Sequence, residues 1–395
     1  MRRLRLSSSL ARWGTRGLLL GLAGCVEPYA PDVISVPTSY LVVDGFINGN
    51  GITRITLSRT ANLSATTPPP VEKGAKLFVV DDSGLSYALT EKNSGFYQSD
   101  SLRLNAARKY QLRITTASNT TYESDLVPLK VTPPIDKLDW KLDGEQVRVS
   151  LSTQDPTHQS RYYRWGVIET WEFNAAFKSQ LEYDTQKKII VARVTPIYTC
   201  WRTERPSSIK QGSSAQLSQD ALTDISILSI NNRAERLKVR YSVLVSQYAE
   251  TAAEFAYLEL LRKNTEATGT VNDPLPTQLT GNIHRTDVAS ETVLGFIGAH
   301  TVQYKRLFIN RQELNLPTAW QFDTPYTNCT QSQELAPDPG DKIPVVIPYT
   351  KVFNGIDTVP IDYLVIDGAQ KGYIGSSRAC ADCRTRGSNV QPSFW

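Results

Sequence analysis

Short segments in which apolar and polar residues alternate constrain the fold of this chain most strongly. The clearest of them, residues 237–246, places five side chains on one face of an extended strand: Leu237, Val239, Tyr241, Val243 and Val245. Similar alternation recurs from residue 40 onward, and turn-forming pairs such as Asn48-Gly49 and Ser83-Gly84 separate the segments. This pattern predicts a mainly β protein built from antiparallel sheets.

The alternating segments fall into two groups, separated at Thr132-Pro133-Pro134. We predict an antiparallel β-sandwich of the fibronectin or transthyretin type over residues 38–131. A larger β-rich domain with one packed helix is predicted over residues 132–395. The helix is expected from Ala249 to about Thr265, where small residues fall at helical spacing on a stripe that should pack on a sheet: Ala249, Ala252, Ala253 and Ala256.

The N-terminus has the features of an export signal. Five arginines and no acidic residue accompany a short apolar stretch at residues 17–23, which is too short to cross a bilayer. The lipobox Leu22-Ala23-Gly24-Cys25 follows. We therefore predict a lipoprotein signal peptide at residues 1–24, a lipidated Cys25 and a tether at residues 25–37. A chance cysteine after a short anchor helix is the alternative.

Removing this signal changes the charge of the chain. Five of the 43 basic residues lie in it, which leaves 38 against 39 acidic residues and a net charge of −1 instead of +4. A chain with this balance lacks the basic excess that nucleic-acid binding needs. We therefore expect no nucleic-acid partner.

Four cysteines remain after Cys25, namely Cys200, Cys329, Cys380 and Cys383. In an exported chain this even number predicts two disulfides; a four-thiolate zinc site and a thioredoxin-like redox pair are the alternatives. We favour Cys200–Cys329 with Cys380–Cys383, because a C-x-x-C pair can close locally. A pairing that ties the tail to Cys200 or Cys329 would stabilise more, since it closes a longer loop.

Motifs for catalysis, metals and cofactors do not occur in the sequence, so no catalytic residue, metal or cofactor is predicted. The histidines His158, His284 and His300 are isolated. The segment 338–341 resembles a turn more than a calcium loop, and Asp81 and Asp82 should point to opposite faces of a strand.

Aromatic residues crowd residues 162–173. Alternation places four of them on one face of a strand: Tyr163, Trp165, Trp171 and Phe173. Such a row can bind sugar rings or a protein partner, but tryptophan is usually well buried, so we favour core packing.

Several segments of the mature chain resemble one known family. They are "LVVDGFI" near the start, "YTCW" at residues 198–201, "NDPLPTQLTGNI" at residues 272–283 and the final "CADCRTRGSNVQPSFW". The family is an outer-membrane lipoprotein family of Bacteroidota-type bacteria, a domain of unknown function (four-two-four-nine). The resemblance implies an accessory partner of a large TonB-dependent β-barrel transporter, and it supplies no catalytic residue. It also draws attention to Asp-Ser/Thr-apolar triplets, with Ser101 and Thr358 as possible O-glycosylation sites.

These features together predict a lipid-anchored outer-membrane protein, with the cell surface favoured over the inner leaflet. Its expected function is a non-enzymatic accessory or binding subunit of a TonB-dependent transporter. A carboxylate-dependent glycan or peptide hydrolase is the alternative, because 39 acidic residues can supply a catalytic pair through folding. A structural envelope protein is a further alternative.

Overall fold

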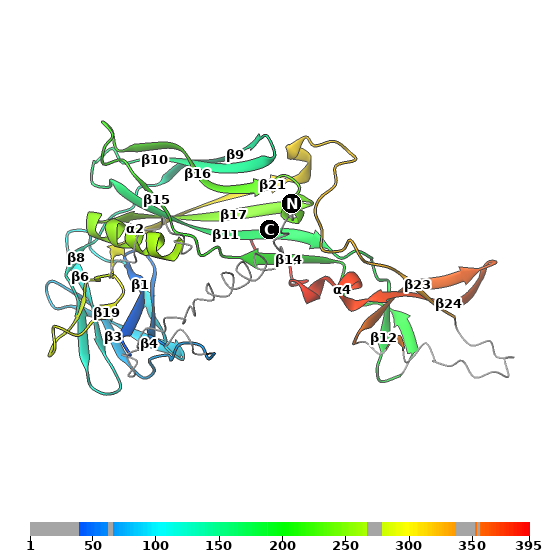
Figure 1. The fold of residues 1–395 in the computed structure, drawn as a ribbon, viewed down its shortest axis with the longest axis horizontal. Helices are drawn as coiled ribbons and strands as arrows, with labels where there is room; N and C mark the ends of the chain where they lie inside the picture. The colour runs from blue at the N-terminus through cyan, green and yellow to red at the C-terminus, as the bar shows by residue number, and fades with distance from the viewer. Residues whose placement is uncertain (1–38, 62–65, 188, 267–278, 336–351, 354–355) are drawn as a thin grey trace, which may run out of the picture.

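The computed structural model describes residues 39–61, 66–187, 189–266, 279–335, 352–353 and 356–395. Strands dominate this part of the chain, and the prediction of a mainly β protein with one packed helix is confirmed. Figure 1 shows an N-terminal β unit, a second unit of two sheets beside it, and an arm that extends away from both. The predicted signal peptide, Cys25 and the tether lie outside the described residues.

The N-terminal unit is an 11-stranded sheet with the order β18-β7-β6-β3-β4-β5-β2-β1-β19, in which β20 also pairs with β1 and β8 with β6. Alternating apolar side chains from these strands enclose one core. The strands are β1 (Leu41–Asn48), β2 (Ile52–Arg59), β3 (Lys76–Asp81), β4 (Ser86–Asn93), β5 (Phe96–Ser101), β6 (Lys109–Thr115), β7 (Thr121–Ser124), β8 (Val127–Pro128), β18 (Ile283–Arg285), β19 (Val293–Leu294) and β20 (Ala299–His300).

A segment from later in the chain completes this unit. Strand β18 pairs with β7 at one end of the strand order, whereas β19 pairs with β1 at the other. The two ends of this strand order lie against each other. Gly281, just before β18, is so close to Gly295, just after β19, that a Cβ added to Gly281 would come within 1.8 Å of the carbonyl oxygen of Gly295. The sheet therefore wraps around its core, and the predicted range 38–131 does not contain all of its strands.

Two sheets pack face to face in the second unit, with orders β16-β10-β9 and β14-β11-β17-β21; β15 also pairs with β11. One apolar core fills the space between them. The predicted alternation is confirmed in β17 for Tyr241, Val243 and Val245, which are buried, whereas Leu237 lies in η1 and Val239 precedes the strand. The elements are β9 (Ile135–Asp143), β10 (Gln146–Gln154), β11 (Tyr162–Asn174), β14 (Thr199–Glu204), β15 (Lys210–Ser213), β16 (Ala221–Asn231), η1 (Glu235–Leu237), β17 (Arg240–Glu250), β21 (Val302–Asn310) and η2 (Arg311–Leu314).

Helix α2 (Ala252–Glu266) forms close to its predicted position but presents the other face to the protein. The alanines Ala252, Ala253 and Ala256 are exposed, so the expectation that they pack on a sheet is wrong. Ala249 is buried, but it belongs to β17 and not to the helix. The inward face carries larger side chains at helical spacing: Glu254, Tyr257, Leu258 and Leu261. These side chains remove more apolar area from water than three methyl groups could, which explains the orientation.

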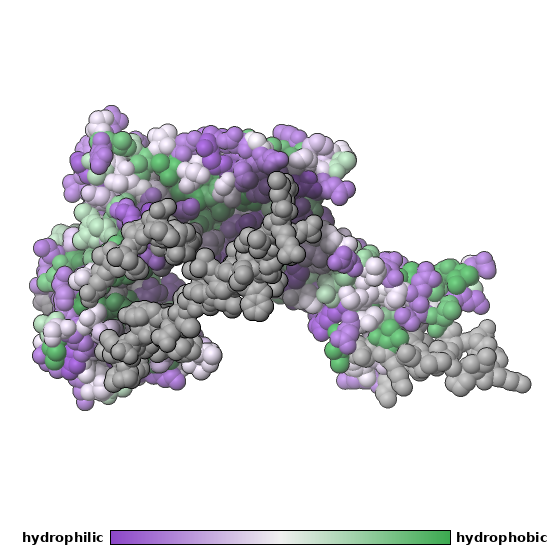
Figure 2. Space-filling view, viewed as in Figure 1, coloured by the Kyte–Doolittle hydropathy of each residue, from purple (hydrophilic) through white to green (hydrophobic). Residues whose placement is uncertain are grey.

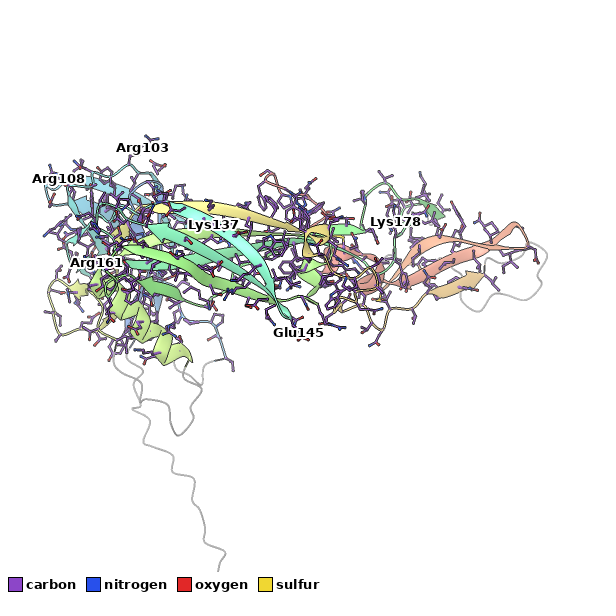
Figure 3. The ribbon with its side chains drawn as sticks, turned by 90° about the horizontal axis from the view of Figure 1, so that it is seen from above. Arg103, Arg108, Lys137, Glu145, Arg161 and Lys178 are labelled. Atoms are coloured by element: carbon purple, nitrogen blue, oxygen red, sulfur yellow. A yellow bond between two sulfur atoms is a disulfide. The ribbon has the colours of Figure 1, made fainter. Side chains whose placement is uncertain are left out.

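The arm is built from segments that lie far apart in the sequence. Figure 3 shows that it extends away from the two larger units. Its apolar cluster of Ile197, Val359, Ile361 and Ala381 is much smaller than the cores of the two larger units, and a cluster of this size supplies little stability alone. Leu181, Phe353 and Leu364 are also buried in the described part of the arm. The elements are β12 (Leu181–Asp184), β13 (Ile189–Ala192), β22 (Ser332–Leu335), β23 (Thr358–Ile366), β24 (Ala369–Ser377), α4 (Arg378–Ala381) and η3 (Cys383–Thr385).

Candidate functional site

Two disulfides join the base of the arm to the rest of the protein. Cys200 of β14 pairs with Cys383, and Cys329 pairs with Cys380 of α4. All four predicted cysteines are therefore in disulfides, but the favoured pairing of Cys200 with Cys329 and of Cys380 with Cys383 is wrong. Cys380 and Cys383 bond to different cysteines, because α4 and η3 lie between the second unit and the loop before β22.

The residue between the two cysteines explains the local C-x-x-C geometry. Asp382 is buried, and its carboxylate accepts hydrogen bonds from the backbone N–H and the guanidinium of Arg384 and from the guanidinium of Arg378. Although burial opposes ionisation, the hydrogen bonds from Arg384 hold the pKa of Asp382 below its usual value. The carboxylate thus fixes the turn that sends Cys380 and Cys383 toward different partners.

The last residues of the chain pack on the outer face of the second unit. The indole N–H of Trp395 donates to Glu172 at 3.2 Å, and the Arg240 guanidinium lies over the rings of Phe308 and Trp395. The backbone of Ser388 pairs with that of Trp201 in both directions. The C-terminal segment is therefore attached to the edge strand β14 by one β-bridge.

The aromatic row of β11 belongs to the core, as favoured above. Tyr163, Trp165, Trp171 and Phe173 are all at most 5% exposed. The Trp165 indole donates to Gln247 at 2.8 Å, so its polar group is satisfied inside the protein. These side chains are inaccessible to a sugar or a protein partner.

The remaining predicted positions are scattered over the fold. Ser101 is exposed at the end of β5, whereas Thr358 is half-buried at the start of β23. The segment 338–341 lies outside the described residues. Within the described ranges, no group of three or more potential ligands could hold a metal ion, and no helix is long and apolar enough to cross a membrane.

The three histidines lie in different surroundings. His158 and His284 are exposed and accompany Asp220 and Asp125, respectively. His300 is fully buried, with its ring stacked on Phe46 at 4.4 Å between centroids. Only His300 therefore belongs to an interior polar cluster.

The outer part of the arm exposes apolar side chains. Tyr363 and Val365 on one face of β23 are 42% and 58% exposed, Ile366 follows at the tip, and Leu335 of β22 is 59% exposed. Figure 2 shows apolar patches on the surface of the arm. We call Tyr363, Val365 and Ile366 of β23 the arm patch. Leu335 is on the opposite face of the sheet from Tyr363, because it pairs with Gly372, which in turn pairs with the buried Leu364. Exposed apolar side chains that gather on a projecting element are typical of a protein-binding surface.

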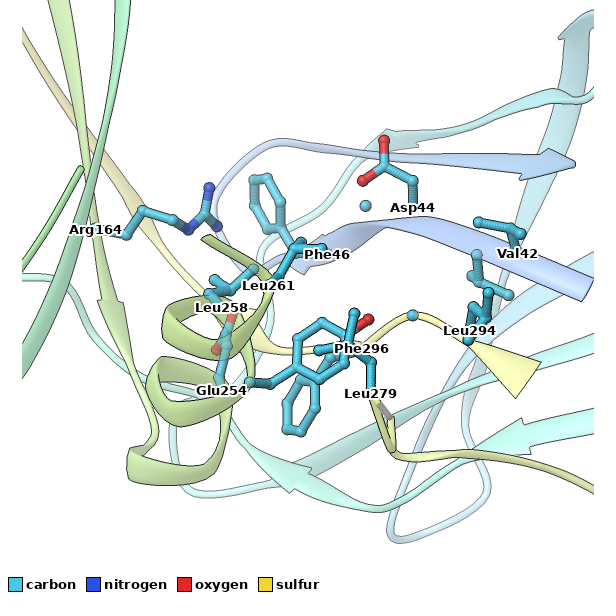
Figure 4. Close-up of a pocket in the computed structure, with 14 residues that line it drawn as sticks. Val42, Asp44, Phe46, Arg164, Glu254, Leu258, Leu261, Leu279, Leu294 and Phe296 are labelled. Carbon is cyan, nitrogen blue, oxygen red and sulfur yellow. The ribbon is translucent and has the colours of Figure 1, made fainter. Parts of the chain in front are cut away.

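A cavity of about 330 Å³ lies where α2 faces β1 (Figure 4). One wall is residues 42–46 of β1, a second is the inward face of α2, and a third is residues 294–296. Three charged side chains, Asp44, Arg164 and Glu254, line this otherwise largely apolar space. The cavity thus lies at the junction of the N-terminal unit and the second unit.

Charged groups continue from the cavity into the interior. The Arg164 guanidinium contacts the Glu250 carboxylate at 2.6 Å and lies over the Tyr248 ring. Burial raises the pKa of Glu250 to about 7, against the opposing effect of Arg164. Glu254 Oε1 lies 3.3 Å from His300 Nε2. The cluster joins α2 to strands of both units.

Sequence reasoning missed both the arm patch and the cavity. Asp44, Arg164, Glu254 and His300 are far apart in the sequence and belong to no motif. The one available signal was a glutamate within an apolar stretch of the predicted helix, at Glu254. The sequence of the arm patch gave no such signal, since the alternating pattern of a strand does not show whether its apolar face is covered in the folded protein.

Comparisons with known proteins show the family to which the chain belongs. No curated protein matches the chain. Among solved structures, a DUF4785 family protein from Legionella pneumophila matches with a TM-score of 0.19 and 10% identity, over 53% of this chain and 52% of that one. The adhesin InvE of Yersinia pseudotuberculosis matches with a TM-score of 0.15 and 12% identity, over 53% and 55%.

A putative carbohydrate binding protein from Bacteroides uniformis matches with a TM-score of 0.15 and 12% identity, over 54% of this chain and 90% of that one. This chain spans about half of the first two structures, and such low TM-scores carry no argument about function. The family model "Domain of unknown function (DUF4249)" matches residues 26–306, which leaves the arm strands β22 to β24 outside the match. Because the match covers well over half of its length, the chain belongs to the DUF4249 family.

Proposed function

We propose that this protein is a lipid-anchored outer-membrane lipoprotein that acts as a non-enzymatic accessory subunit of a TonB-dependent transporter, and that the arm patch binds this partner. The observation that carries the proposal is the arm itself. It extends from the body (Figure 3), exposes the large apolar side chains of the arm patch, and is joined to the second unit by the Cys200–Cys383 disulfide, while Cys329–Cys380 closes its base. Covalent attachment restricts the conformations of an element with so small an apolar cluster.

Burial of the arm patch supplies a physical reason for association. Apolar surface contributes roughly 25 cal/mol per Å² when it is removed from water, and aromatic residues such as Tyr363 often dominate interfaces. An arm held in one conformation also loses little entropy on binding. The lipobox supports the location, because a diacylated Cys25 would anchor the chain stably.

Capture from envelopes tests the partner. Tagged full-length protein would be purified from detergent-solubilised outer membranes, and co-purifying proteins identified by mass spectrometry. We expect a large β-barrel to co-purify, and the variant Tyr363→Ser/Val365→Ser to reduce its recovery at least tenfold. The matched control Leu85→Ser/Leu126→Ser removes exposed apolar side chains from the N-terminal unit and should leave recovery unchanged.

Recovery of a lone monomer that hydrolyses a glycan or a peptide would reject the proposal in favour of an enzyme. Equal barrel recovery with both double variants would reject the arm patch as the contact.

A separate measurement tests the anchor. Cys25→Ala should move the protein from the membrane fraction to the soluble fraction, and protease treatment of intact cells should digest the wild type if it faces outward. Unchanged membrane retention of Cys25→Ala would contradict lipid anchoring.

A further inference from the structure

We propose that the cavity between β1 and α2 binds an organic cation with an apolar body, such as an arylalkyl amine. Its walls come from Val42–Phe46 of β1, the inward face of α2 and the segment 294–296. This inference goes beyond the accessory role proposed above, because it concerns other residues and does not require the arm patch.

The charges around the cavity favour a cation. Three carboxylates, those of Asp44, Glu250 and Glu254, accompany the single guanidinium of Arg164. Arg164 is already engaged, since it contacts Glu250 at 2.6 Å and lies 4.4 Å from the centroid of the Tyr248 ring. Of the charged side chains that line the cavity, Arg164 is thus taken up by Glu250, which leaves the carboxylates of Asp44 and Glu254 to face the space, with His300 beside Glu254 on its Oε1 side.

Glu254 supplies the buried acceptor. The residue is 3% exposed and lines the cavity, and among the described residues its Oε2 has no hydrogen-bond partner. Gly298 makes room for the carboxylate, because a Cβ at that position would come within 2.1 Å of Oε2. A buried carboxylate oxygen without a donor is unfavourable, and an N–H group of a bound cation would relieve this.

The remaining walls suit an apolar body. Phe46, Tyr257 and Phe296 contribute aromatic rings, with leucines between them (Figure 4). A volume of about 330 Å³ lies at the lower end of the range for small-molecule sites. Aromatic faces also attract cations. An anion of the same size would instead lie against Asp44 and Glu254, and a neutral molecule without a donor would leave Oε2 unpaired.

Two arylalkyl probes of similar size and opposite charge test the inference. Phenethylammonium and 3-phenylpropionate would each be titrated into the detergent-solubilised full-length protein, followed by saturation-transfer NMR and calorimetry, with empty micelles as the blank. We expect phenethylammonium to bind at least tenfold more tightly than 3-phenylpropionate. Equal binding of the two probes, or binding of neither, would overturn the inference.

Substitutions then locate the site. Glu254→Gln should weaken phenethylammonium binding at least tenfold, whereas the control Glu259→Gln, on the same helix but outside the cavity, should not change it. Asp44→Asn, at an exposed position, should weaken it about two- to fivefold.

Leu258→Trp should abolish binding by filling the space, with circular dichroism confirming the fold. If Glu254→Gln fails to fold, the Leu258→Trp variant alone tests whether phenethylammonium binds in the cavity. Undiminished binding by Glu254→Gln or by Leu258→Trp would refute the assignment.

Discussion

Removing the disulfide at the base of the arm gives a prediction whose size follows from the fold. Cys329 and Cys380 are 51 residues apart, and a closed loop of that length corresponds to about 4 kcal/mol of stabilisation in the chain-entropy model. We expect Cys329→Ser/Cys380→Ser to lower the free energy of unfolding by an amount of this order. Because the apolar cluster of the arm is much smaller than the cores of the two larger units, the arm should become sensitive to protease before those units do.

The loss in free energy of unfolding is measured by guanidinium unfolding without added oxidant or reductant, so that the remaining disulfide stays intact. Limited proteolysis with mass spectrometry shows which part of the protein is destabilised. The variant Cys200→Ser/Cys383→Ser serves as a comparison. Its two cysteines are 183 residues apart, so removing their disulfide should lower the free energy of unfolding by about 5 kcal/mol. Thiol titration separates the pairings, because each of these double variants should show no more free thiols than the wild type. Cys380→Ser/Cys383→Ser should show two more. A mapped Cys380–Cys383 peptide, or an unchanged unfolding midpoint, would refute the reasoning.

Two further predictions concern the interior. Burial raises the pKa of Glu250 to about 7 in the folded state, so the folded protein binds more protons than the unfolded chain between about pH 4.5 and 7, and stability from this group is lost as pH rises through that window. The unfolding free energy of Glu250→Gln minus that of the wild type should therefore rise by about 1–3 kcal/mol as the pH is raised from 5 to 8, whatever the offset from losing the contact with Arg164. Urea unfolding at several pH values measures this, and parallel pH profiles would contradict it. Trp165→Ala should lower the free energy of unfolding by about 3–5 kcal/mol, whereas the exposed Leu142→Ala should change it by less than about 0.5 kcal/mol; equal midpoints would show that the aromatic row is not core.

The local sequence pattern was sufficient to predict individual strands and the helix, but not which strands pair with one another. The alternation in β17 and the aromatic row of β11 were predictable, because period two fixes which side chains share a face. Nothing local shows that β18, β19 and β20 complete the N-terminal sheet, since their pairing depends on contacts with strands far away in the sequence. The orientation of α2 has the same cause: the surface that it covers comes partly from β1.

The disulfide pairing shows why spacing alone misleads. Two cysteines three residues apart suggest a local bond, yet the chain turns at Asp382, whose carboxylate is held by Arg384 and Arg378. That turn directs Cys380 and Cys383 to different partners. The cavity was hidden for a related reason, because its charged residues come from β1, β11 and α2 and meet only in the folded protein.

The most distinctive part of the sequence, its C-terminal segment, has a structural role throughout. Its cysteines attach the arm, Asp382 fixes the turn, Gly387 allows close approach to the Trp201 carbonyl, and Trp395 covers Arg240 on the outer sheet face. This segment, which lies outside the family match, therefore serves the fold. The groups proposed for binding lie elsewhere, in the exposed arm patch and around the Glu254 oxygen that has no partner among the described residues, where ordinary residue types acquire a role through placement alone.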